Sequence, residues 1–167
     1  KPAELLVRAL DELLDYQDYP VLAAERSTMN RRPLGVGIIN FAYWMAKNNM
    51  TYSEPNLHMI NDWAEAWSYY LIKASNKIAQ EKGPCKLNYQ TKYSKGIMPV
   101  NTYKAEVNEL VPHDPQMDWN SLADDLREYG IRNSTLMALM PSETSSQISN
   151  ATNGIEPPRA LVSIKQS

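Results

Sequence analysis

Hydroxyl side chains are concentrated in one short stretch of the chain, between residues 135 and 154. The stretch opens with a short apolar run at 136–140 that stops at Pro141, and a run of this length before a proline predicts a buried strand. Four hydroxyl groups follow it almost at once, on Ser142, Thr144, Ser145 and Ser146. Each of them can donate a hydrogen bond to a phosphate oxygen, so this stretch is the first candidate for a binding site.

The same residues are expected to begin a helix. Thr144 and Gln147 have the spacing of a capping box, and Asn153 with Gly154 supplies the left-handed residues that end many helices. The first amides of a helix lack acceptors and carry partial positive charge, so they stabilise an anion without Lys or Arg. The pattern therefore predicts a phosphate or diphosphate site. Taken alone, the spacing favours a simpler interpretation, an ordinary capped helix rich in Ser and Thr.

Length and composition describe a globular chain. The 167 residues are 43% apolar and 22% charged, which suits one domain with a real core. The net charge is −2 and no basic block is present, so direct nucleic-acid binding is not expected. No apolar run is long enough to cross a membrane and no signal peptide is recognisable, which predicts a cytoplasmic protein. Because the first residue is Lys1, the sequence suggests a piece of a longer chain.

Cysteine and histidine offer little chemistry. Cys85 is the single cysteine, which forbids an internal disulfide and any metal site built on a cysteine pair. It has no histidine near it in the sequence, so we interpret it as a structural thiol. His58 and His113 are isolated, with no second ligand at metal-binding spacing. No catalytic residue and no metal site are therefore predicted in this chain.

The hydrophobic pattern predicts a mostly helical chain with a few strands. Residues 2–16 read as a helix whose inner face carries Leu6, Leu10, Leu13 and Leu14, and the clearest helix covers 54–82. Asp118 and Gly130 bound a further helix. A short helix is predicted at 101–110, connectors at 21–32 and 89–103, and strands at 136–140 and 160–164.

Residues 34–47 are apolar on nearly every side, which predicts a buried helix, with a strand at 36–41 as the alternative. Gly35 and Gly37 lower helix propensity there, so we expect another backbone to pass close to them. A helix that leads into a strand and then into a second helix is typical of α/β construction, with ligands at the carboxyl end of the strand.

Several stretches of the sequence resemble one family. The longest is 141–159 (PSETSSQISNATNGIEPPR), and shorter ones are 31–43 (RRPLGVGIINFAY), 69–75 (YYLIKAS), 95–99 (KGIMP) and 132–135 (RNST). They occur in the same order in the large, catalytic subunit of class I ribonucleotide reductases, so the resemblance covers nearly the whole chain. It implies a mostly helical segment of a ten-stranded α/β barrel with about two barrel strands, that is, a single partial domain over 1–167.

The resemblance also implies a ligand for the hydroxyl cluster. In that family the loop corresponding to 141–147 holds the diphosphate of the nucleotide substrate, which carries over to Ser142, Glu143, Thr144, Ser145 and Ser146. A carboxylate repels a diphosphate at short range, so we expect the amide of Glu143, and not its side chain, to face the ligand.

The family reduces ribonucleoside diphosphates to deoxyribonucleoside diphosphates by radical chemistry. The resemblance implies three kinds of partner: the remainder of the large subunit, a small subunit whose metal centre delivers the radical, and deoxynucleotide or ATP effectors bound elsewhere. The motifs that carry the family's catalytic cysteines have no counterpart in these residues, so no cofactor is expected in this segment.

The sequence leaves three interpretations of the chain open. The chain is a diphosphate-holding segment of a reductase, either an excised piece or one product of a split gene. Alternatively, it is a non-catalytic helical module that binds a nucleotide or phosphate and serves in interactions. The third interpretation is a purely structural helical domain with no ligand.

Overall fold

The computed structural model describes residues 1–112, 114–158 and 160. Six α-helices lie in this part of the chain: α1 (Pro2–Tyr16), α2 (Leu22–Arg31), α3 (Phe41–Lys47), α4 (Leu57–Lys82), α5 (Trp119–Tyr129) and α6 (Glu143–Ile148). Short 3-10 turns follow α4, at Asn88–Gln90, Tyr93–Lys95, Pro99–Asn101 and Ala105–Glu109. No helix of the described chain is both long and apolar enough to cross a membrane.

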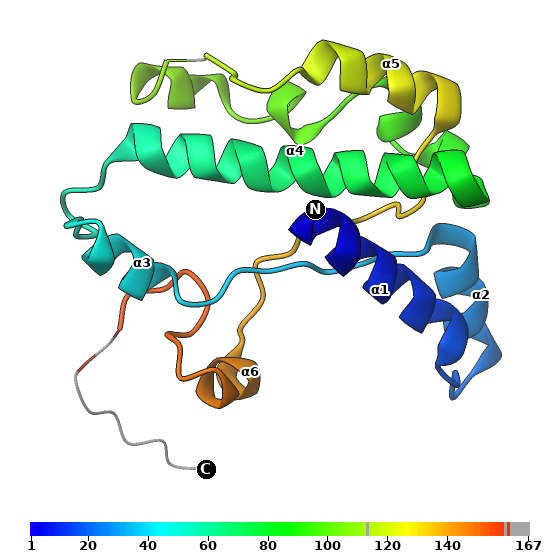
Figure 1. Ribbon diagram of the computed structural model, residues 1–167, viewed down its shortest axis with the longest axis horizontal. Helices are drawn as coiled ribbons and strands as arrows, with labels where there is room; N and C mark the ends of the chain where they lie inside the picture. The colour runs from blue at the N-terminus through cyan, green and yellow to red at the C-terminus, as the bar shows by residue number, and fades with distance from the viewer. Residues whose placement is uncertain (113, 159, 161–167) are drawn as a thin grey trace. The chain divides into compact units, whose positions relative to one another are not determined.

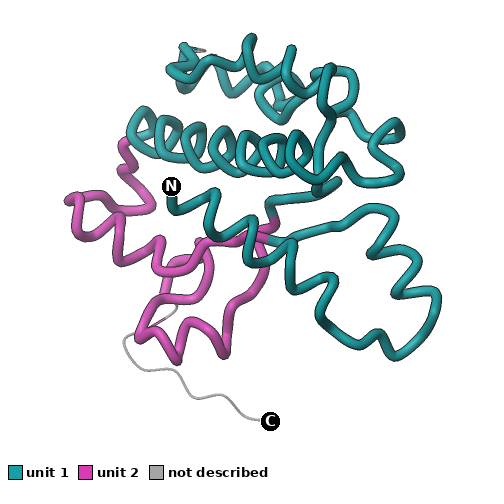
Figure 2. Tube along the Cα trace, turned by 45° about the vertical axis from the view of Figure 1, so that its right-hand side comes forward, with its two compact units in different colours: residues 1–35, 57–137 teal, residues 36–56, 138–167 magenta. Residues whose placement is uncertain are grey.

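The chain divides into two compact units, which Figure 2 shows in different colours. Unit 1 consists of Lys1–Gly35 and Leu57–Met137, and unit 2 consists of Val36–Asn56 with the described part of Ala138–Ser167. Compact units of this kind are not in themselves separate domains, so the single partial domain over 1–167 stays a prediction.

Unit 1 is built around α4, with α1 packed on one side and α5 on the other (Figure 1). The sequence predictions for these three helices are confirmed. Asp118 accepts from the amide of Ser121 at the start of α5, and Gly83 at φ +84° follows the end of α4. The core between the helices contains Ile72, Ile78 and Leu126, all fully buried. Burial of one such side chain contributes about 1.5–3 kcal/mol.

The inner face of α1 differs from the predicted leucine stripe. Val7 and Asp11 are the buried residues of this helix, whereas Leu6 and Leu13 are exposed. Asp11 is buried because its carboxylate forms ion pairs with two arginines of unit 1. The leucine pattern predicts the correct element and part of its inner face, since Leu10 and Leu14 are half-buried while Leu6 and Leu13 are exposed.

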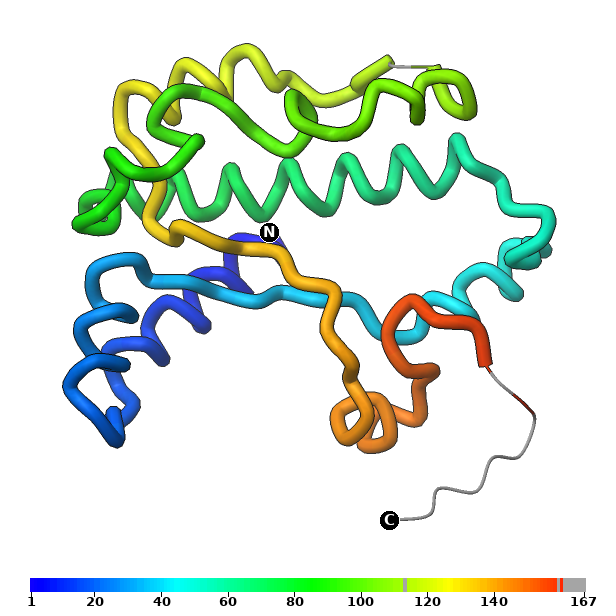
Figure 3. The backbone as a smooth tube through the Cα atoms, turned by 180° about the vertical axis from the view of Figure 1, so that it is seen from behind, coloured from blue at the N-terminus to red at the C-terminus, as the bar shows by residue number. Residues whose placement is uncertain are grey.

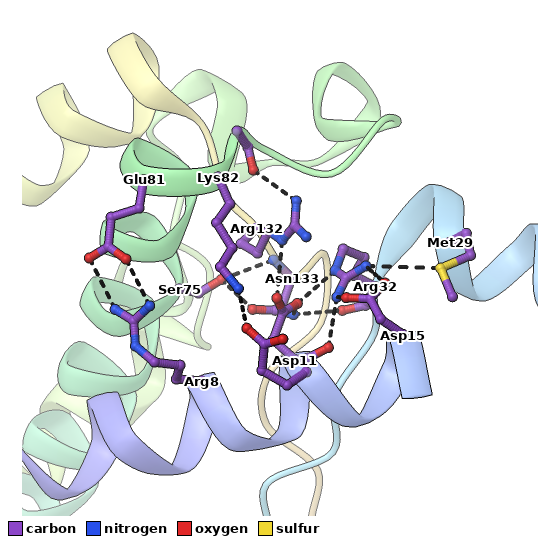
Figure 4. Close-up of polar contacts among 12 residues, drawn as sticks. Arg8, Asp11, Asp15, Met29, Arg32, Ser75, Glu81, Lys82, Arg132 and Asn133 are labelled. Atoms are coloured by element: carbon purple, nitrogen blue, oxygen red, sulfur yellow. Dashed lines mark hydrogen bonds and ion pairs between the residues drawn. The ribbon is translucent and has the colours of Figure 1, made fainter. Parts of the chain in front are cut away.

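A buried polar network surrounds Asp11 (Figure 4). Its carboxylate accepts from Arg32 Nε at 2.7 Å, from Asn133 Nδ2 at 2.9 Å and from Arg132 Nε at 3.1 Å. Asn133 in turn exchanges two hydrogen bonds with the hydroxyl of Ser75 on α4. Arg32 and the pair Arg132–Asn133 belong to two of the motifs singled out in the sequence, so this network gives both motifs a structural role.

Two elements of the first half were predicted wrongly. Residues 21–32, expected as a connector, contain α2, and the helix expected over 34–47 begins only at Phe41. Residues 32–35 instead run beside 132–137 (Figure 3), where the amide of Leu34 donates to the carbonyl of Thr135 at 2.8 Å. Backbone hydrogen bonds to a distant segment compete with helical ones, and the low helix propensity of glycine favours the extended form here.

The predicted strands and the α/β class are not confirmed in the described part of the chain. Val36 and Met137 are isolated bridge residues, and 136–140 forms no regular strand. A strand requires a regular ladder of hydrogen bonds along several consecutive residues. The extended segments make separate backbone bonds, Ser134 to Arg31, Leu34 to Thr135 and Ala138 to Val36, without a run of residues in strand geometry. The second predicted strand, 160–164, lies outside the described residues apart from Ala160. The helix expected at 101–110 is present only as the 3-10 turns at Pro99–Asn101 and Ala105–Glu109.

Candidate phosphate-binding loop

The predicted phosphate loop lies in unit 2, where α6 begins at Glu143 with Ser142 as the residue that precedes the first turn. The capping box expected between Thr144 and Gln147 is wrong, because the residue before the helix is Ser142, two positions earlier than Thr144, and Ser142 makes no side-chain cap bond. The hydroxyl of Ser142 is instead used by a segment that follows the helix.

Ser142 is clamped to residues 153 and 154. Its amide donates to Asn153 Oδ1 at 2.7 Å, and its hydroxyl lies 2.9 Å from the same oxygen. The amide of Gly154 donates to Ser142 Oγ at 2.9 Å, so the hydroxyl acts as donor and acceptor at once. Ser142 is 7% exposed. These three hydrogen bonds fix the point at which the chain enters α6.

The end of α6 also differs from the prediction. The helix ends at Ile148, and Asn150 takes the left-handed conformation at φ +49°. The amide of Ala151 donates to Ser146 and that of Asn150 donates to Gln147, which together form a Schellman motif. Asn153 and Gly154 are therefore not the helix stop that the sequence suggested. Both residues instead form hydrogen bonds with Ser142, which directly precedes the start of the helix.

The five predicted site residues fall into two groups. Ser142 and Ser146 are buried, and their hydroxyls lie within hydrogen-bonding distance of other groups of unit 2. Glu143, Thr144 and Ser145 are exposed in the first turn of α6. Among the described residues, nothing accepts a hydrogen bond from the amides of Thr144 and Ser145, as the geometry of a helix start requires. The predicted hydroxyl cluster thus divides into two buried serines, Ser142 and Ser146, and the exposed first turn of α6.

A small cavity of about 160 Å³ opens next to the loop. Its walls include Ile38, Met140 and Pro141 on one side and Asn153 to Glu156 on the other. None of the five predicted site residues lines it, although Pro141 directly precedes them. The cavity is therefore a neighbour of the open turn and not the turn itself.

A third segment of unit 2 supports the residues that hold Ser142. Asn40 donates from its amide to the carbonyl of Thr152 at 2.8 Å, and its Oδ1 accepts from the amide of Thr152 at 3.1 Å. Tyr52 donates from its hydroxyl to the carbonyl of Ile155 at 2.8 Å, and partial burial raises the pKa of this phenol. Residues 150–155 are thus tied to the first half of unit 2 on one side and to Ser142 on the other.

The expectation of a close backbone approach is met at Gly37. A Cβ atom placed there would lie 2.2 Å from Met140 Sδ and 2.8 Å from the carbonyl oxygen of Ala138. The amide of Ala138 also donates to the carbonyl of Val36 at 3.1 Å. Glycine is therefore required at this position by packing against the segment that leads into the loop.

Sequence reasoning missed Asn40 and misread Asn153. Asn40 directly precedes α3, a position at which asparagine is a common helix cap, and that signal could have identified it as a special residue. Its side chain makes no cap bond, however, and bonds to Thr152 instead. No local sequence pattern predicts a contact with a residue more than a hundred positions away.

The remaining candidate groups give no chemistry of their own. Cys85 is buried, and burial raises the pKa of its thiol, although neighbouring hydrogen bonds and arginine charges oppose the shift. His58 is exposed at the start of α4, and His113 lies outside the described residues. Across the described ranges, no three His, Cys, Asp or Glu side chains gather in a way that could hold a metal ion.

Comparison with known proteins gives one family. The ribonucleotide reductase barrel domain matches residues 1–167. The chain is 57% identical over 162 residues to the ribonucleoside-diphosphate reductase subunit alpha of Haemophilus influenzae, covering 96% of this chain and 21% of that protein. It is 55% identical over 155 residues to the reductase 1 subunit alpha of Escherichia coli, covering 92% and 20%, respectively.

A viral relative is similar as well. Subunit alpha of the reductase of Enterobacteria phage T4 is 49% identical over 165 residues, covering 99% of this chain and 22% of that protein. The chain thus spans about a fifth of the length of the curated relatives that it matches. From the match over all 167 residues, this mostly helical chain belongs to the ribonucleotide reductase barrel domain family.

Proposed function

We propose that this chain is the segment of a ribonucleoside-diphosphate reductase large subunit that holds the diphosphate of the substrate. The ligand sits at the first turn of α6, where the amides of Thr144 and Ser145 and the nearby hydroxyls donate to phosphate oxygens. The observation that carries the proposal is that these two exposed amides have no acceptor in the described chain, while Ser142 beneath them is fixed.

The charge pattern of the loop is consistent with this role. Between residues 138 and 154 the single ionisable side chain is that of Glu143, so neutral donors do the binding. The backbone of Glu143 faces the ligand, and its carboxylate turns away because two negative groups repel each other at short range. The contribution of the loop is orientation of the substrate, which aligns the ribose for chemistry carried out by other groups.

The rest of the reductase supplies that chemistry. The cysteines that reduce the ribose lie in the remainder of the large subunit, and the radical comes from a metal-containing small subunit, in the cytoplasm. Effector nucleotides bind outside this segment, and the extended residues around Val36 and Met137 take part in the barrel sheet as its strands.

A chimeric enzyme tests the proposal. This chain replaces the 162 matching residues of the Haemophilus influenzae subunit alpha, and reductase activity is measured with its small subunit. We expect an active chimera. Ser145→Pro removes one donating amide and should raise KM for the ribonucleoside diphosphate about tenfold, the cost of one charge-assisted hydrogen bond. Ser145→Ala keeps the amide and should raise KM less.

Ser149→Ala is the matched control, because Ser149 is exposed just beyond the end of α6. Its KM should equal that of the unmodified chimera. A folded chimera whose KM is the same for Ser145→Pro and for Ser149→Ala would reject the diphosphate site. A folded chimera with no activity would instead favour a non-catalytic binding module.

A further inference from the structure

We infer that Asn40 is a positioning residue for the substrate diphosphate, acting through Thr152 and Ser142 without touching the ligand. The inference rests on the proposed function and extends it to a part of unit 2 far from the loop in the sequence. It assigns a role to the side chain of the residue that precedes α3, which makes no cap hydrogen bond to that helix.

Asn40 and Thr152 are joined by a reciprocal pair of hydrogen bonds. The amide of Asn40 donates to the carbonyl of Thr152, and the amide of Thr152 donates to the side-chain oxygen of Asn40. Both polar groups of the Thr152 backbone are thereby used by one residue. A pair of this kind fixes the direction as well as the distance of the segment that contains Thr152.

The backbone of Asn40 is held in the left-handed region, at φ +67°. Asparagine is among the few residues other than glycine that adopt this conformation readily. The positive φ is the conformation in which the amide and the side-chain oxygen of Asn40 both meet Thr152. Asparagine thus suits this position for two reasons: its backbone adopts the left-handed conformation readily, and its side-chain oxygen accepts the hydrogen bond from Thr152.

The support passes from Thr152 to the loop through the next two residues. Asn153 accepts from the amide of Ser142, and Gly154 donates to its hydroxyl. Ser142 immediately precedes the first turn of α6, so a shift of 152–154 moves the amides of that turn. Apolar packing offers little compensation, because Val36, Met45 and Met50 are the buried apolar side chains of unit 2 in its described part.

One further observation marks the position of Thr152 as constrained. The hydroxyl oxygen of Thr152 is buried and has no hydrogen-bond partner in the described chain. Leaving a buried hydroxyl unsatisfied is unfavourable, and a free segment would turn it toward water. The two hydrogen bonds between Asn40 and Thr152 hold the segment in place against this tendency.

Three variants of the 167-residue chain separate the contributions. Asn40→Gly keeps the left-handed backbone and removes the acceptor, whereas Asn40→Asp keeps both. Asn49→Gly is the matched control, because Asn49 also has a positive φ, +56°, in unit 2 and is exposed. Amide hydrogen exchange of residues 142–154 and the affinity for ADP, followed by phosphorus NMR, are measured for each chain.

We expect Asn40→Gly to speed exchange in 142–154 and to weaken ADP binding, each about three- to tenfold, the effect of one lost hydrogen bond. Asn40→Asp and Asn49→Gly should stay within about twofold of the unmodified chain in both measurements. Rescue by Asn40→Asp distinguishes the acceptor from a general loss of structure.

Two results for the Asn40 variants would contradict the inference. Unchanged exchange and affinity in Asn40→Gly would overturn the inference, and so would an equal loss in Asn40→Gly and Asn40→Asp. If ADP fails to bind even to the unmodified chain, the proposed function is contradicted for this chain. The exchange data then still decide whether Asn40 holds residues 142–154.

Discussion

The polar centres of the two units are built on different principles. In unit 1 the buried carboxylate of Asp11, 1% exposed, is surrounded by two arginines and an asparagine. In unit 2 the clamp on Ser142 consists of neutral groups alone, namely backbone amides, one hydroxyl and one side-chain amide. The difference teaches that a charged centre secures helix packing in unit 1, while a neutral centre holds the start of α6 in unit 2. Under the proposed function, this neutral centre leaves the exposed amides of α6 to an anion.

The two centres should also differ in what a single substitution costs. Removing one partner of a buried ion pair leaves an uncompensated charge, whereas losing one neutral hydrogen bond costs much less.

Asp11→Ala should have the largest effect, about 3–5 kcal/mol of unfolding free energy, because it leaves Arg32 buried without its innermost partner. Chemical denaturation monitored by circular dichroism measures this loss. The control is Asp124→Ala, in which an ion pair with a 78% exposed carboxylate is removed. It should cost less than about 1 kcal/mol. A similar loss in both variants would show that burial does not set the strength of the Asp11 network.

Acid should destabilise the same network. Burial raises the pKa of Asp11, but hydrogen bonds from Arg32 and Asn133 and the charge of Arg132 outweigh it, so the pKa lies below its usual value. A lowered carboxylate pKa contributes stability above the unfolded-state value of about 4, and this stability is lost as pH falls through the folded-state pKa. Unfolding free energy should therefore be flat above about pH 5 and fall below about pH 4.

Asp11→Asn tests the assignment of this acid sensitivity, since the amide cannot titrate. The variant should be less stable at neutral pH and lose less stability on acidification. An unchanged acid slope in Asp11→Asn would place the sensitivity elsewhere. The clamp on Ser142 has no titratable group, so it should add nothing to the slope.

Gly37→Ala should have an intermediate effect, about 1–3 kcal/mol, because overpacking forces the backbone to move. The side chain of Met140 can turn aside, but the carbonyl of Ala138, 2.8 Å from the added Cβ, cannot. Hydrogen exchange should report faster opening in unit 2 than in the helices of unit 1. Protection that falls equally in both units would contradict a local origin of the strain.

Ser142→Ala should have the smallest effect on stability, about 1 kcal/mol, since it removes the acceptor of Gly154 and one contact with Asn153. Its consequence should be confined to exchange of residues 142–154. Ser149→Ala again serves as the comparison, because that serine is exposed and lies outside the clamp. Equal exchange in the two variants would show that the Ser142 hydroxyl does not hold residues 142–154.

The parts of the fold that the sequence predicts are those set by local physics. Regular apolar spacing, Asp118 and the glycines at 83 and 130 are sufficient for α1, α4 and α5. The sequence does not predict where residues 32–40 go, because pairing with 134–138 is a long-range effect that competes with helix propensity. It also misses Asp11 on the buried face of α1, since hydrophobicity alone cannot anticipate a buried aspartate.

The candidate site shows the same division. The hydroxyl cluster and a helix start are recognisable from 142–147, but their register is not, because Asn153 and Gly154 determine where α6 begins. Asn40 contributes from more than a hundred residues away, and only the folded chain brings it to Thr152. Local signals therefore identify the residues of the exposed first turn, while the residues that support this turn are visible only in three dimensions.

The most direct measurement is a proton–nitrogen NMR titration of the 167-residue chain with pyrophosphate. We expect the amide signals of Thr144 and Ser145 to shift most, because these donors have no acceptor in the described chain. The amides of Ser142 and Ser146 already donate to Asn153 and to the carbonyl of Ser142, so they should shift far less. Larger shifts outside the first turn of α6, or no shift at Thr144 and Ser145, would contradict the diphosphate site.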